Sequence, residues 1–167
     1  MDKVQELLIK MLKRNDFFKD MCDESLLKFS NLFKLDMASK GDAVIIENHN
    51  PENVYILKTW TLLAKKANWL NSVVLWQVNE WETFGEMSFF YNKPAMASVV
   101  CDSDSASFWK ISKEDFKKFL DENPKIKTMI MEVLSKREKN NKEKLWWKLD
   151  LRPSYDMEWI DDIEINL

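Results

Sequence analysis

The chain has 167 residues, a net charge of −3 and 46% hydrophobic residues. This length fits one domain with its own hydrophobic core and leaves no room for a second. The acidic balance argues against nucleic-acid binding through bulk electrostatics, and no apolar run is long enough to span a membrane.

The first third of the chain predicts helices followed by strands. Residues 2–14 form an amphipathic pattern, which indicates a helix rather than a signal peptide. Residues 15–35 are expected to be a helical entry, in which Asp23 caps a helix. The apolar face of that helix is formed by Leu26, Leu27, Phe29, Leu32 and Phe33. A turn at Lys40-Gly41-Asp42 then leads into the strands.

Short apolar runs separated by turns predict strands at 43–47, 54–58, 61–65, 72–78, 97–101 and 106–111. After them Ser112 can cap a helix, and Asn123-Pro124 breaks it before the helical period resumes at Ile126. The predicted fold class is therefore α+β, an antiparallel β-roll of the jelly-roll kind with N-terminal helices and C-terminal helices that cover a pocket or form a dimer.

The candidate site lies in the segment 84–98. Gly85 allows the backbone to turn and to approach a ligand closely, and the helical turn that follows presents free N–H groups to an anion. Glu86 can accept hydrogen bonds from a sugar hydroxyl, and Ser98 can donate one to a phosphate oxygen. The candidate ligand-binding residues are Phe84, Gly85, Glu86, Met87, Ser88, Pro94, Ala95, Ala97 and Ser98. We expect no metal ligands among them.

This segment resembles the phosphate-binding cassette of cyclic-nucleotide-binding domains, the β-roll of catabolite activators and of protein kinase A regulatory subunits. Weaker matches to other motifs of the family, in the same order along the chain, extend the resemblance over residues 15–135. The resemblance implies a cyclic nucleotide, cAMP or cGMP, as ligand. However, Ala95 stands where the family has the arginine that pairs with the phosphate. Losing that contact costs roughly 2–5 kcal/mol, so we expect such a ligand to bind weakly or not at all.

The resemblance divides the chain into an N-terminal amphipathic helix at 1–14, the nucleotide-binding-like domain at 15–135, and a charged helical extension with an acidic tail at 136–167. The residues after the last matched helix are too few for a helix-turn-helix, so a DNA-binding domain and nucleic-acid partners are not expected. The segment 126–147 can serve as a dimer helix or pack on its own domain. A homodimer or a regulated partner protein is thus the expected macromolecular partner.

No catalytic motif is present, and we do not expect an enzyme. His49 lies in a loop beside Asn and Pro, without a nucleophile or second histidine, and is interpreted as a turn residue. Cys22 and Cys101 have no metal-ligand spacing and are expected to be buried free thiols in a reducing cytoplasm.

The chain has only 2 Gly but 8 Trp, and tryptophans occupy positions where turns favour glycine. Trp60, Trp69 and Trp81 each stand at such a turn, and Trp76 is a candidate for a fourth case. Either these are true tryptophans in strained turns, or the gene uses UGA as a glycine codon and some glycines have been written as tryptophan. Trp109 differs, because it lies inside an apolar strand and is expected in the core.

Two functions remain open. In the first, the protein is a regulatory sensor in which a ligand orders the cassette and draws the C-terminal helices over it. In the second, the pocket binds nothing and the domain is a structural or protein-interaction module with the same fold. Ala95 favours the second function for cAMP and cGMP, whereas Glu86 and Ser98 keep the first open for other ligands.

Overall fold

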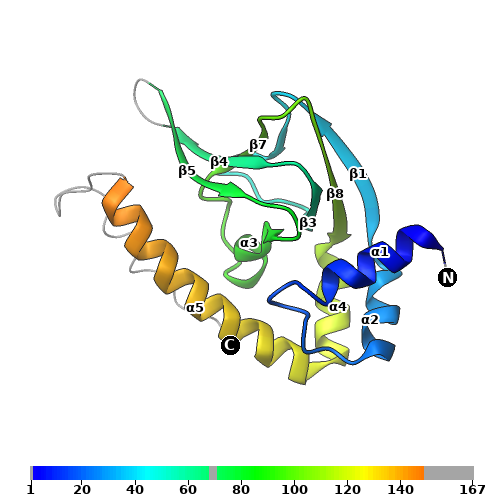
Figure 1. Cartoon of the computed structure of the whole chain (residues 1–167). Coiled ribbons are helices and arrows are strands. Elements are labelled where there is room, and N and C mark those ends of the chain that lie inside the picture. The colour runs from blue at the N-terminus through cyan, green and yellow to red at the C-terminus, as the bar shows by residue number, and fades with distance from the viewer. Residues whose placement is uncertain (1, 68–70, 149–167) are drawn as a thin grey trace.

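The structure is a computed structural model that describes residues 2–67 and 71–148, with side chains described up to residue 140. Within this part of the chain, two four-stranded sheets form a β-roll that is flanked by helices (Figure 1). The pairings are antiparallel, in the orders β1-β8-β3-β6 and β2-β7-β4-β5. This architecture confirms the predicted fold class.

The strands are β1 (Lys34–Ser39), β2 (Ala43–Ile45), β3 (Asn53–Thr59), β4 (Leu62–Ala67), β5 (Ser72–Val78), β6 (Thr83–Phe84), β7 (Ser98–Cys101) and β8 (Ser105–Ser112). The helices are α1 (Lys3–Leu12), α2 (Asp23–Ser30), α3 (Glu86–Phe90), α4 (Lys113–Glu122) and α5 (Pro124–Lys148). The strand predicted at 72–78 matches β5, and the other predicted strands agree to within a few residues.

The strands β3 and β8 are buried on both faces, and their side chains alternate between two cores. Tyr55 and Leu57 of β3, with Phe108 of β8, point into the roll, where they pack against residues of the second sheet. Val54 and Ile56 point to the opposite face and pack against the helices. This alternation follows from the two-residue period of a strand, and it explains why both strands are nearly continuous apolar runs.

The helical core packs α1, α2, α4 and α5 against the outer face of β3 and β8. Its centre is a group of aromatic rings, of which Phe18, Phe29 and Phe116 are fully buried. Leu8, Met11 and Leu12 bury the apolar face of α1 in the same cluster, so the N-terminal helix docks on the domain. Ser112 caps α4 as predicted, because its hydroxyl accepts a hydrogen bond from the Asp115 N–H at 3.0 Å.

The predicted helical entry at 15–35 is wrong in part. The helix α2 begins at Asp23 with Cys22 as its N-cap and ends at Ser30, so that Leu32 and Phe33 lie beyond it. Residues 34–39 form the edge strand β1, which the sequence did not reveal. Its burial alternates weakly and several of its side chains are exposed, which is why it lacks a strong apolar signal.

The long helix α5 runs without a break through the predicted boundary at residue 135. Its apolar residues Ile126, Ile130 and Leu134 are buried in the domain's own core. Of the two alternatives for this helix, these contacts favour packing on its own domain. The predicted acidic tail at 149–167 and the hairpin tip at Trp69 lie outside the described residues.

Both cysteines are free thiols. Cys101 is buried as predicted, but the prediction is wrong for Cys22, which is exposed because the N-cap of α2 faces solvent. Trp109 is buried as expected, at 4% exposure. None of the described helices combines the length and apolarity that a bilayer crossing needs.

Two tryptophans adopt the left-handed backbone conformation that favours glycine. Trp60 has φ 71° and Trp81 has φ 76°. The other described non-glycine residues with positive φ are Asn48 and Asn92, and asparagine tolerates this region. Trp76 is not among them: it lies in the strand β5, beside a shift in the register of its pairing with β4. The structure therefore separates Trp76 from the two turn positions.

Candidate ligand-binding site

A single left-handed turn connects the strand β6 to the short helix α3. At this turn Gly85 has φ +80°, and a Cβ built on it would lie 3.1 Å from Ile45 Cδ1 and 3.2 Å from Tyr55 Cδ2. Phe84 fixes the strand side of the turn by stacking on Tyr55, with ring centroids 4.9 Å apart. Glycine is therefore required both by the backbone conformation and by the packing.

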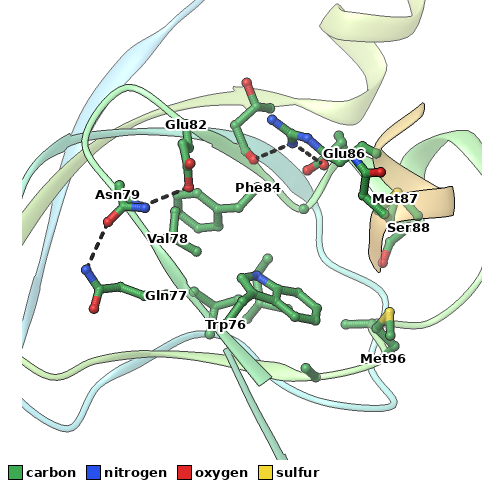
Figure 2. Close-up of a pocket in the computed structure, with 18 residues that line it drawn as sticks. Trp76, Gln77, Val78, Asn79, Glu82, Phe84, Glu86, Met87, Ser88 and Met96 are labelled. Carbon is green, nitrogen blue, oxygen red and sulfur yellow. Dashed lines mark hydrogen bonds and ion pairs between the residues drawn. The ribbon is translucent and has the colours of Figure 1, made fainter. Parts of the chain in front are cut away.

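The turn borders a cavity of about 320 Å³ between β5, the cassette and α5 (Figure 2). Seven of the nine predicted residues line it: Phe84, Gly85, Glu86, Met87, Ser88, Ala95 and Ala97. The remaining two, Pro94 and Ser98, are not among its lining residues. The hydroxyl of Ser98 instead accepts a hydrogen bond from the Glu47 N–H at 2.9 Å, which ties β7 to the end of β2.

The carboxylate of Glu86 is buried in the cavity wall and paired with an arginine from α5. Glu86 is 5% exposed, and its Oε1 lies 2.8 Å from Arg137 Nη1. The same nitrogen donates to the Thr83 carbonyl at 3.1 Å. Burial raises the pKa of Glu86 above its ordinary value, and the neighbouring guanidinium opposes that rise. The ion pair with Arg137 thus offsets the free-energy cost of burying the Glu86 carboxylate.

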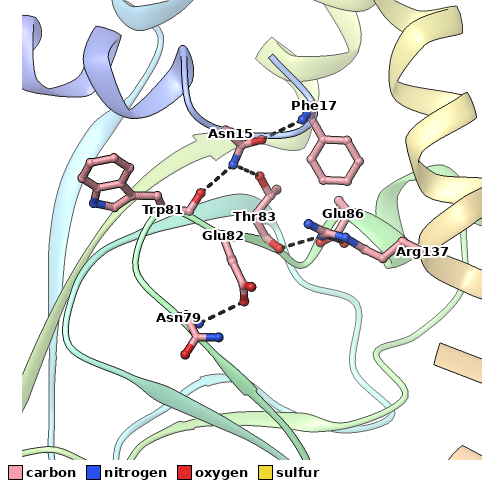
Figure 3. A network of polar contacts seen from close by, with 8 residues as sticks. All are labelled: Asn15, Phe17, Asn79, Trp81, Glu82, Thr83, Glu86 and Arg137. Carbon is pink, nitrogen blue, oxygen red and sulfur yellow. Dashed lines mark hydrogen bonds and ion pairs between the residues drawn. The ribbon is translucent and has the colours of Figure 1, made fainter. Parts of the chain in front are cut away.

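The cassette is also connected to the segment that follows α1 (Figure 3). The amide nitrogen of Asn15 donates to the Trp81 carbonyl at 2.7 Å and to the Thr83 hydroxyl at 2.8 Å. Its amide oxygen accepts from the Phe17 N–H at 2.9 Å. The Arg137 guanidinium lies over the Phe17 ring, 4.6 Å from its centroid. One network therefore joins the N-terminal segment, the cassette and α5.

A second contact holds α5 against α3. The hydroxyl of Tyr91, at the end of α3, donates to Glu138 Oε2 at 2.8 Å. Burial and this hydrogen bond raise the pKa of Tyr91, so the phenol stays protonated. Because Arg137 and Glu138 are adjacent, a single turn of α5 makes both contacts to the cassette. This turn therefore fixes α5 against the cassette.

Comparison with known proteins identifies the family. The model of the cyclic nucleotide-binding domain matches residues 37–123, which include the whole cassette. The chain belongs to the cyclic nucleotide-binding domain family. Domains of this family are regulatory and non-catalytic modules.

Solved structures share the fold of this chain. A cyclic nucleotide-binding domain from Methylobacillus flagellatus has a TM-score of 0.72 at 17% identity, covering 87% of this chain and 84% of that one. The regulatory domain of Toxoplasma gondii PKA with cAMP has a TM-score of 0.66 at 21% identity, covering 71% and 46%.

A third structure is the regulatory subunit of a cAMP-independent protein kinase A from Trypanosoma cruzi, bound to guanosine. It has a TM-score of 0.64 at 16% identity, covering 71% and 42%. The chain thus spans less than half the length of these two kinase subunits.

The charges around the cavity of this cyclic nucleotide-binding domain are unusual for an anion site. Among the described lining residues, the charged side chains are Glu82, Glu86 and Arg137. The guanidinium of Arg137 is already bonded to Glu86 and to the Thr83 carbonyl. Ala95 is 6% exposed and offers no side-chain donor. The charged lining side chains are therefore more negative than positive, and alanine stands at the position where the resemblance implies a cationic partner for a phosphate.

Sequence reasoning missed Met96 and the lining residues that come from outside the cassette, which are Ile45, Trp76, Gln77, Val78, Asn79, Glu82, Thr83, Val99, Arg137 and Asn140. Met96 lies inside the predicted segment, but no chemical signal singled it out. Arg137 is 51 residues from Glu86 in the chain and stands in a charge-rich run that is typical of a solvated helix. No local pattern distinguishes it from the lysines beside it.

Proposed function

We propose that this domain is a regulatory sensor for a nucleoside-like molecule, one that carries sugar hydroxyls but no phosphate charge. The observation that carries the proposal is the buried Glu86 carboxylate, paired with Arg137 in a cavity where Ala95 replaces a cation. A buried carboxylate accepts hydrogen bonds from hydroxyl groups and repels phosphate oxygens. Binding of cAMP or cGMP is expected to be weak.

The magnitude of the selectivity follows from the missing guanidinium. A charge-assisted bidentate contact to a phosphate is among the strongest polar contacts in proteins. Removing one member of such a buried pair costs roughly 2–5 kcal/mol, which corresponds to an affinity lower by roughly thirtyfold or more. The guanosine-bound Trypanosoma cruzi structure supports the proposal, because it is a relative by fold whose ligand has no phosphate.

The helix α5 is the proposed output of the sensor. Arg137 and Asn140 line the cavity, and Glu138 holds the hydroxyl of Tyr91. A sugar hydroxyl that bonds Glu86 competes with Arg137 for the same carboxylate oxygens. Occupancy therefore changes the contacts that position α5, and a partner protein or a neighbouring domain can read that change. The free thiols Cys22 and Cys101 support a reducing, cytoplasmic location for this activity.

Calorimetric titration of the purified chain with guanosine, adenosine, cGMP and cAMP tests the proposal. We expect the parent chain to bind a nucleoside at least tenfold more tightly than its cyclic nucleotide. Ala95→Arg should raise cyclic-nucleotide affinity by roughly thirtyfold or more. Ala95→Gln, which adds length without charge, is the matched control and should not. Equal affinity of the parent for guanosine and cGMP would contradict the proposed selectivity.

The second candidate function is a module that binds no small molecule. This candidate is favoured because Arg137 already donates a hydrogen bond to the Glu86 carboxylate in the structure. The buried charge of Glu86 therefore has a partner without any ligand. Absence of binding to the parent, with cyclic-nucleotide binding gained in Ala95→Arg, would select this candidate. It would show that the pocket is intact but that its native role is structural or in protein interaction.

A further inference from the structure

The strand β1 is an edge of the first sheet, and its backbone groups are open on one side. Among the described strands it pairs with β8 only, and Figure 1 shows it at the margin of the molecule. The Ser39 N–H donates to Asp42 Oδ2 at 2.8 Å, and the Ser39 carbonyl accepts from the Asp42 N–H at 2.9 Å. Both groups thus face away from β8. Because alternate residues of a strand share a side, the backbone groups of Leu35 and Met37 face the same open edge.

Apolar side chains lie uncovered beside this edge. Met37 is 67% exposed, which is the highest value for a large apolar residue in the part of the chain that the structure describes, and Leu35 is 43% exposed. Leu35 pairs with the buried Trp109 and shares the face of the sheet on which the helices pack. On α1, Val4 and Leu7 are also exposed. An open strand edge with adjoining apolar side chains is a template for pairing with another strand.

We propose that β1 is a dimerisation edge, at which two copies of this chain pair antiparallel about a two-fold axis at Leu35. This inference is independent of the proposed function. Leu35 would lie opposite Leu35 of the partner subunit, and the two sheets would join into one. In this register Lys34 lies opposite the partner's Asp36, and the symmetry forms that pair twice. Opposite charges directly across a strand pair are stabilising.

Charge selects this register over its neighbours. A shift of the axis by one residue along β1 keeps opposite side chains on a common face. Centring the pairing on Lys34 would oppose two lysines, and centring it on Asp36 would oppose two aspartates. Like charges directly opposite each other are destabilising. Of these three centres, only Leu35 places a lysine opposite an aspartate.

The polar groups at the edge exchange one partner for another on pairing. In the single chain the Met37 N–H donates to Asp36 Oδ1 at 2.8 Å, and Asp36 Oδ2 lies 2.5 Å from Lys110 Nζ. In the dimer the Met37 N–H would donate to the carbonyl of Phe33 of the partner subunit. Asp36 Oδ1 is then released to accept from the partner's Lys34, and the contact with Lys110 remains. Each of these groups therefore keeps a hydrogen-bond partner.

Sedimentation equilibrium of the full chain measures this association. Stable interfaces bury about 800 Å² on each partner, and a short strand pairing buries less, so we expect a dissociation constant between about 1 μM and 1 mM. Lys34→Glu opposes like charges twice and should weaken dimerisation by about fivefold or more. Lys125→Glu changes the net charge equally at an exposed position on α5 and should leave dimerisation unchanged. Leu35→Pro removes an edge-facing N–H without touching the pairing with β8 and should abolish the dimer.

Disulfide cross-linking tests the register. In a Cys22→Ser background, which removes the exposed native thiol, Leu35→Cys should cross-link two chains under mild oxidation. The reason is that opposite Cα atoms of a hydrogen-bonded antiparallel pair lie about 5.5 Å apart, within the range of a disulfide. Met37→Cys is the matched control, because in this register Met37 lies opposite Phe33 of the partner subunit. It should not cross-link.

Three outcomes would overturn the inference. The first is a parent chain that stays monomeric up to about 1 mM. The second is a dimer that Lys34→Glu and Leu35→Pro leave unchanged, which would place the interface elsewhere. The third is cross-linking of Met37→Cys as readily as Leu35→Cys, which would refute the register. Thermal unfolding of each variant separates loss of the dimer from loss of the fold, and if Leu35→Pro does not fold, Lys34→Glu decides.

Discussion

Replacing Trp60 tests whether the turn positions need glycine. Trp60 has φ 71°, its side chain is 61% exposed, and its N–H donates to Glu80 Oε1 at 3.0 Å. The left-handed region costs a residue with a Cβ about 1–2 kcal/mol. Glycine relieves this strain, and the hydrogen bond from the backbone N–H remains available to it.

The cleanest measure is the difference between Trp60→Gly and Trp60→Ala, because both variants remove the same indole. Only the glycine variant relieves the strain of about 1–2 kcal/mol, while its extra freedom in the unfolded chain costs about 0.5–1 kcal/mol. We therefore expect Trp60→Gly to be more stable than Trp60→Ala by about 0.5–1 kcal/mol.

The same comparison at two other tryptophans sharpens the test. Trp81 has φ 76°, and its ring lies under the Arg14 guanidinium at 4.5 Å. Both Trp81 variants lose that contact, but Trp81→Gly should again be more stable than Trp81→Ala. Trp76 lies in the strand β5 without a positive φ, so the sign should reverse, with alanine more stable than glycine by about 0.5–1 kcal/mol.

Urea unfolding followed by far-UV circular dichroism measures these free-energy differences, with thermal midpoints as a second readout. For a chain of this size, 1 kcal/mol corresponds to a shift of about 2–4 °C. If the alanine variants at Trp60 and Trp81 are as stable as the glycine variants, or more stable, the argument from backbone strain is refuted. The same sign at all three positions would show that indole packing, not φ, decides the outcome.

The remaining predictions concern the cassette and the gene. Gly85→Ala should destabilise the domain by about 2 kcal/mol or more, since its Cβ would meet Ile45 and Tyr55 at a positive φ; unfolding in urea with an unchanged midpoint would contradict this. Arg137→Leu should cost about 3 kcal/mol by leaving Glu86 buried and unpaired, and Glu86→Gln in the same chain should recover part of the loss; no recovery would disprove the pairing. The pKa of Glu86 is raised by burial above 4.5, so its contribution to stability is largest below that pH and declines as the pH rises through the raised pKa. Compared by urea unfolding from pH 4 to 7, the parent should lose stability relative to Glu86→Gln, and the opposite slope would refute the assignment. Finally, mass spectrometry of the protein from its source cells should find glycine at position 60, whereas tryptophan there would exclude the UGA hypothesis at that codon.

Much of the fold followed from local patterns in the sequence. The strand β5 matches its predicted range, Ser112 caps α4, and Gly85 occupies a turn that other residues would strain. These features depend on side-chain period, capping and backbone conformation, which are encoded within a few neighbouring residues. The edge strand β1 lacks such a signal because most of its side chains are exposed and polar and apolar residues are mixed along it.

The chemistry of the cavity was decided by tertiary structure. The sequence placed Glu86 and Ala95 in one site, and it indicated a glycine-like backbone at Trp60 and Trp81. Only the fold brings Arg137 onto Glu86 across 51 residues of chain, and only sheet register turns Trp76 toward the same cavity. Contacts between distant segments depend on how helices and sheets pack, and no local period records which charged residue of a polar helix will meet a buried carboxylate.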